Sequence, residues 1–222
     1  TTGFVNGQAY ANYTNGRNNF GLEYGLNFRD FDNRITNRVY GYTLQNSHYN
    51  TNENKRDHFG YTYQDIALRY TNSLIDNYVF QAKFSMNIFN YFSKGNGQSI
   101  FTKDNNSEFH GTSQYSGENY NPPKLDLYFS KKIGKKDEIS INVVGSSYTS
   151  ESFQIDKEWV INSGSIVFDN DMNLKAKQNS IVGEIAYTHD FKAGKLSAGY
   201  RIDNNNVDNN LENLAGNFDF SV

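Results

Sequence analysis

Apolar and polar residues alternate with a period of two in the segment 78–90, YVFQAKFSMNIFN. Side chains of an extended strand point to opposite faces in turn, so this period predicts a β-strand with one apolar and one polar face. In a soluble protein the apolar face would pack in a core, whereas in a membrane barrel it would contact lipid. The apolar face carries Tyr78, Phe80, Ala82, Phe84, Met86 and Ile88, and the other face carries Val79, Gln81, Lys83, Ser85, Asn87 and Phe89.

The same period recurs along the whole chain, and helical periodicity is nearly absent. Turn signals such as NGRN (15–18) and FKAGK (191–195) separate some of the alternating segments. We therefore predict an all-β fold that forms a single unit over residues 1–222. Its nine expected strands span residues 4–14, 19–30, 58–71, 78–92, 124–132, 139–150, 179–190, 196–203 and 215–222.

The links between these strands alternate between short and long. Links 15–18, 71–77, 133–138 and 191–195 are short, whereas 31–57, 93–121 and 151–178 are long and polar. Outer-membrane barrels are built with short periplasmic turns and long outer loops. The alternation therefore predicts an antiparallel transmembrane β-barrel whose short links face the periplasm and whose long links face the outside.

The distribution of charge fits the same interpretation. The residues that define the apolar faces, such as Phe20, Leu22 and Leu68, include no charged side chain. A soluble sandwich also keeps charge off its core face, so a soluble β protein stays open as an alternative. The opposite faces carry Glu23, Arg29, Asp65, Arg69, Lys83, Asp126, Glu184, Arg201 and Asp203.

Composition changes the balance between these alternatives. Hydrophobic residues make up 36% of the 222 residues, aromatic residues make up 16%, and the mean hydropathy is −0.76. This is a thin supply for a soluble core, whereas half of each barrel strand faces water. The net charge of −3 gives no indication of nucleic-acid binding, and the lack of cysteine excludes a disulfide framework.

Nine is an odd number of strands, whereas bacterial single-chain outer-membrane barrels have even numbers. We expect these strands to form one arc of a larger barrel wall. The alternative is that a strand is miscounted or merged with its neighbour.

Two stretches carry a family resemblance. PPKLDLYFSKKIGKKDEISINVVGSSYTSESF (122–153) and YTHDFKAGKLSAGYRIDNNN (187–206) resemble wall segments of TonB-dependent outer-membrane receptors of Gram-negative bacteria. The resemblance covers most of residues 120–222, and residues 1–119 are similar only in style. These motifs concern architecture, such as the hairpin turn at Gly194, and do not indicate a ligand.

The resemblance implies a barrel of about 22 strands that is filled by an N-terminal plug domain. It also implies import of a bulky nutrient, of the glycan, metal chelate or cobalamin class, with energy delivered by TonB. We expect the plug and the rest of the barrel to be missing from this chain, outer-membrane lipid to surround it, and a surface lipoprotein to be a further candidate partner. The alternatives are a stand-alone porin or adhesin-type barrel, a protease or lipase at the barrel rim, and a soluble β protein.

We predict no catalytic, cofactor-binding or metal-binding residues, and no enzymatic activity. His48, His58, His110 and His189 lack metal-ligand spacing, so we expect the first three to be solvated in the long links and His189 to lie at the interface. The segment DNDMN (169–173) begins like a calcium loop but lacks its glycine and glutamate. Calcium binding by the Asp/Asn-rich loops, with a geometry looser than that of a calcium loop, stays open as an alternative.

Aromatic residues in the long links are the candidate ligand contacts, because such rings stack on sugars or flat ligands. The alternative is that tyrosine is simply common in such loops. The abundance of Asn and Tyr suits neutral polar ligands better than highly charged ones. The candidates are Tyr40, Tyr42, Tyr49, Tyr115, Tyr120 and Trp159.

Overall fold

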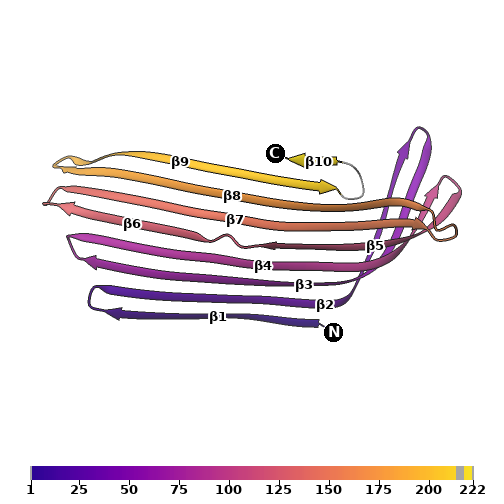
Figure 1. Ribbon diagram of the computed structural model, residues 1–222, viewed down its shortest axis with the longest axis horizontal. Coiled ribbons are helices and arrows are strands. Elements are labelled where there is room, and N and C mark those ends of the chain that lie inside the picture. The colour runs from indigo at the N-terminus through magenta and orange to yellow at the C-terminus, as the bar shows by residue number, and fades with distance from the viewer. Residues whose placement is uncertain (1, 214–217, 222) are drawn as a thin grey trace.

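The computed structural model describes residues 2–213 and 218–221 and forms one antiparallel β-sheet (Figure 1). The all-β prediction is confirmed. Among the described residues, no helix has the length and apolar character needed to cross a membrane. The strands are β1 (Thr2–Asn15), β2 (Asn18–Leu44), β3 (Ser47–Leu74), β4 (Tyr78–Lys103), β5 (Asn106–Tyr120), β6 (Lys124–Ile133), β7 (Asp137–Val160), β8 (Ile166–Phe191), β9 (Gly194–Asn213) and β10 (Phe218–Ser221).

The ten described strands occupy nine positions in the sheet, because β5 and β6 share one place. Both pair with β4 on one side and with β7 on the other. The segment between them contains Pro122 and Pro123, and proline has no N–H group to donate to the ladder. All other neighbours are consecutive in the chain. Of the expected strand 215–222, residues 215–217 and 222 lie outside the described residues.

The long links at 31–57, 93–121 and 151–178 are not loops, so this part of the sequence prediction is wrong. They are the distal halves of the strands, and they form hairpins (Figure 1). The β2–β3 hairpin closes through Gln45 and Asn46, whose φ angles of 48° and 66° suit a type I′ turn. These halves are mostly polar and carry scattered apolar residues, so they show no hydrophobic period although their backbones pair.

The predicted faces of the strands that correspond to β1–β4 and β6–β9 are confirmed by the register. Directly paired residues lie on the same face, and one row joins Leu22, Leu68, Phe84 and Leu125 across β2, β3, β4 and β6. We call this side the apolar face and the side that bears Glu23 the polar face. Two charged residues near the ends of the expected strands correct the expectation of an uncharged apolar face: Asp30 and Lys131 also lie on it.

The apolar face has no layer packed against it. The described side chains include no buried hydrophobic residue, and Leu196, Tyr200 and Ile202 are 63%, 70% and 60% exposed. Globular domains bury an apolar sheet face against a second layer. Between its edges this sheet satisfies its backbone hydrogen bonds, but it leaves its apolar side chains uncovered.

The β2–β3 hairpin has a β-bulge and curves upward at its distal end in Figure 1, while β3 stays paired with β4. The register shifts between Phe31 and Arg34, and Asn33 has a φ of 65°. The extra residue reverses the facing of β2, so that Arg34 meets Asp57 on the polar face. Arg34 Nε donates to Asp57 Oδ1 at 2.9 Å, and the guanidinium lies 4.3 Å from the ring centre of Phe59.

The bulge makes Asn33 sensitive to side-chain type. Asn33→Val should lower the free energy of unfolding by about 1–2 kcal/mol, because a β-branched residue is strained in the left-handed region. Asn33→Gly should stay near the wild type. Urea unfolding of the full-length protein measures both variants, and equal stability of the two would contradict the bulge geometry.

Candidate functional site

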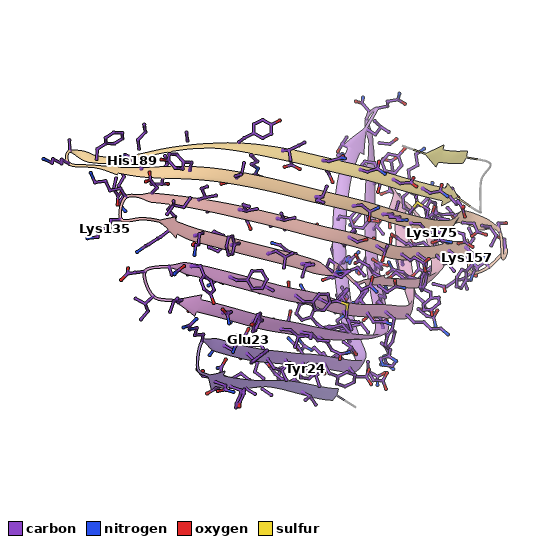
Figure 2. The ribbon with its side chains drawn as sticks, turned by 60° about the vertical axis from the view of Figure 1, so that its left-hand side comes forward. Glu23, Tyr24, Lys135, Lys157, Lys175 and His189 are labelled. Carbon is purple, nitrogen blue, oxygen red and sulfur yellow. The ribbon has the colours of Figure 1, made fainter. Side chains whose placement is uncertain are left out.

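The candidate site lies at the distal end of the sheet, which we define by the turns at 45–46, 104–105 and 161–165. The proximal end carries the short turns that follow β1, β3, β6 and β8. Figure 2 shows Lys135 and His189 at the proximal end and Lys157 and Lys175 toward the distal end. Beyond the bulge, the polar faces of β2, β3, β4, β5 and β7 continue side by side.

A cavity of about 350 Å³ opens on this distal polar face, and we call it the distal pocket. Small residues in its middle make room for it: Ser99 pairs with Glu53 on one side and with His110 on the other. Larger side chains surround this floor. The lining residues are Tyr40, Tyr42, Thr51, Glu53, Ser99, Phe101, Glu108, His110, Thr112, Glu158 and Val167.

His110 is held between two carboxylates. Its Nδ1 lies 2.5 Å from Glu158 Oε1, and its Nε2 lies 3.0 Å from Glu108 Oε2. The side chain is only 5% exposed. Burial alone would lower the pKa of His110, but the hydrogen bonds to Glu158 and Glu108 outweigh it and raise the pKa above its ordinary value. The prediction of a solvated His110 is therefore wrong.

Two hydroxyl groups at the floor of the distal pocket lack partners within the described part of the chain. Ser99 is 4% exposed, and its Oγ makes no hydrogen bond; the buried Thr112 Oγ1 makes none either. A buried hydroxyl without a partner costs roughly 1–3 kcal/mol. Such groups therefore favour a ligand or water that supplies the missing hydrogen bonds.

The six candidate aromatic residues do not form one site. Tyr40 and Tyr42 line the distal pocket, and Tyr49 stacks on Tyr42 with ring centres 4.9 Å apart. Tyr115 and Trp159 lie on the apolar-face side of β5 and β7, where Tyr115 contacts Phe153. Tyr120 stacks on Phe89 at 4.8 Å, away from the pocket-lining residues.

The other histidines lie elsewhere in the sheet. His48 hydrogen-bonds Thr43 beside the distal turn, His58 contacts Asp30, and His189 Nδ1 lies 2.6 Å from Asp137 Oδ1 at the proximal end. The DNDMN segment (169–173) belongs to β8 and is an extended strand that does not curve around a cation.

Sequence reasoning missed the pocket residues other than Tyr40 and Tyr42, because it placed them in loops. Residues 93–121 show no hydrophobic period, so the sequence pattern carried no signal for the strands that bring Ser99, Phe101 and Glu108 together. Among the described residues, no group of three or more His, Asp or Glu is arranged to hold a metal ion.

No protein-family model matches this chain, and no curated protein matches it significantly.

The His110 cluster predicts a specific titration. A raised pKa in the folded state means that protonated His110 stabilises the fold. This stabilisation is fully present below the unfolded-state pKa of about 6.5, and it is lost as the pH rises through the folded-state pKa. In an NMR titration of the full-length protein, His110 should have a midpoint above 6.5, and Glu158→Gln should lower that midpoint. A His110→Gln variant assigns the signal. A midpoint below 6.5, or one indifferent to Glu158→Gln, would contradict the geometry.

Proposed function

We propose that this chain is part of the barrel wall of a TonB-dependent receptor in the outer membrane of a Gram-negative bacterium, which imports a bulky nutrient. The observation that carries the membrane part is the continuous, uncovered apolar face of the sheet. Lipid is the environment that would cover such a face without a second protein layer. The rest of the barrel, the plug and TonB enter through the sequence resemblance.

The apolar residues form a band whose limits run obliquely across the strands. In β2 it ends proximally at Phe20, whose row of paired residues runs across the sheet to Ile202 in β9. In β9 the apolar residues continue six residues farther, to Leu196. The distal limit of the apolar residues shifts likewise. It lies at Phe28 in β2 and at Ile202 in β9, whereas the residue of β9 that shares the row of Phe28 is Asn210, eight residues beyond Ile202.

This shift supports a barrel wall quantitatively. Six strand-to-strand steps separate β2 from β9, so the apolar band moves by about one residue per step. With ~3.4 Å per residue and ~4.8 Å between strands, the strands make an angle of roughly 35–45° with the normal to the band. Strands of membrane barrels are tilted by this amount.

The margins of the band also favour a bilayer. Beyond its distal limit the same face carries cross-strand charge pairs, Lys175 with Glu151 at 4.0 Å and Lys157 with Asp169 at 3.3 Å. Near its proximal limit lie Tyr78 and Tyr187, as expected for an interfacial aromatic girdle.

The polar face is charged within the same band, as expected for a barrel interior. Arg69 donates to Glu23 at 2.6 Å and 3.0 Å, and Lys83 lies opposite Asp126 in the register of β4 and β6. In the described part of the chain, the outer edge of β1 pairs with no strand. An open edge supports a wall segment, because a membrane barrel must close through further strands.

The first test places arginine on each face of β4. Phe84→Arg should destabilise the protein in vesicles, lowering its free energy of unfolding by roughly 2–4 kcal/mol, because Phe84 lies in the apolar band beside Leu68 and Leu125. Tyr78→Arg should have an intermediate effect near the interface, and Gln81→Arg on the polar face should have little. Reversible folding of the full-length protein measures all three.

A lipid-facing strand and a strand in a soluble core differ in how their stability depends on the bilayer. The penalty of Phe84→Arg should change with bilayer thickness, and folding should require lipid. Folding without lipid, with a penalty independent of thickness, would exclude the membrane proposal. Gln81→Arg as the most damaging variant would reverse the facing of β4.

The second test concerns orientation. Lys103 ends β4 beside the distal turn, and Lys135 lies in the proximal turn between β6 and β7. Trypsin added to intact cells should cut the full-length protein after Lys103 and spare Lys135, because the distal turns face outward in this proposal. Permeabilised cells serve as the control and should expose both sites. Cleavage at Lys135 in intact cells, with Lys103 spared, would invert the topology.

A further inference from the structure

We propose that the distal pocket binds a primary ammonium group carried by an organic ligand, a specificity that rests on the proposed receptor function. Three observations lead to this ligand class. They are the carboxylates, the unpartnered hydroxyls and the aromatic rings that line the pocket.

The carboxylates give the pocket a negative character. Glu53, Glu108 and Glu158 all line it. Glu108 and Glu158 hold His110, whereas the nearest cation to Glu53 is the exposed Arg38, at the limiting distance of 4.0 Å. The Glu53 side chain is only 20% exposed, so it is partly desolvated and weakly paired. A cationic ligand would neutralise the negative charge of the Glu53 carboxylate.

The hydroxyls determine which cation fits. Ser99 pairs directly with Glu53 in the register, and its Oγ is buried without a hydrogen-bond partner. Thr112, with a second unpartnered hydroxyl, pairs with Gly97, two residues from Ser99 along β4. A primary ammonium has three N–H donors, which can be shared between the carboxylate and these oxygens. A quaternary ammonium has no N–H group and would leave both hydroxyls unsatisfied.

The rings complete the site. Tyr40, Tyr42 and Phe101 line the same cavity, and aromatic faces attract cations within about 6 Å. Gly97 lets Thr112 pack closely against β4, because a Cβ atom there would lie 2.7 Å from Thr112 Oγ1 and 2.8 Å from the Asn54 carbonyl oxygen. This combination departs from the neutral ligands that the Asn and Tyr content favours, because the pocket gathers carboxylates that are scattered along the sequence.

The experiment compares glucosamine with glucose, which differ by an ammonium group in place of a hydroxyl. Calorimetric titration of the full-length protein in vesicles should show binding of glucosamine at least about tenfold tighter than binding of glucose. Glu53→Gln should weaken glucosamine binding by about tenfold or more, and Ser99→Ala should weaken it severalfold. Glu151→Gln, a carboxylate change on the apolar-face side, is the matched control and should leave binding unchanged.

The outcomes separate the two proposals. If the protein folds only in lipid but binds glucose and glucosamine equally, or if Glu53→Gln binds like the wild type, the ammonium site is wrong and the receptor proposal stands. If the protein folds without lipid, the receptor proposal fails whatever the pocket binds. Circular dichroism of each variant before titration ensures that only folded protein is compared.

Discussion

The uncovered apolar face is the constraint on which the rest of the structure depends. The single-layer sheet satisfies its backbone through cross-strand hydrogen bonds, and its described side chains form no buried hydrophobic core. A soluble sheet of this kind would expose a contiguous apolar surface, which favours aggregation. Whatever covers this face therefore determines whether the fold is stable, and the slant of the apolar band across β2–β9 favours a bilayer.

The distal hairpins follow from the same constraint. Once the strands pass the apolar band, both faces can be polar, and charge pairs, tyrosines and hydroxyls replace the aliphatic rows. The Phe31/Arg34 bulge bends β2 and β3 there and brings Arg34 onto Asp57. This geometry sets a polar surface with a defined pocket on strands that continue the sheet.

Hydrophobic period alone was enough to predict the strands and their faces within the band. Phe20–Phe28 in β2 and Tyr78–Ile88 in β4 alternate because their two faces meet different environments. The same signal fails at 31–57 and 93–121, where both faces are polar and only pairing across the sheet reveals the strands. The distal pocket could not be predicted because Glu53, Ser99, His110 and Glu158 meet only through the register of four strands.

Single-cysteine spin labelling tests the central claim most directly, since this chain contains no native cysteine. Labels along β2 and β9 of the full-length protein in vesicles should alternate between access to oxygen and access to a water-soluble nickel complex. The deepest labels should lie near Tyr24 in β2 and near Tyr200 in β9, following the slanted band. A lack of alternation, or a maximum depth at Asn204, which shares the row of Leu22, would contradict a tilted lipid-facing wall.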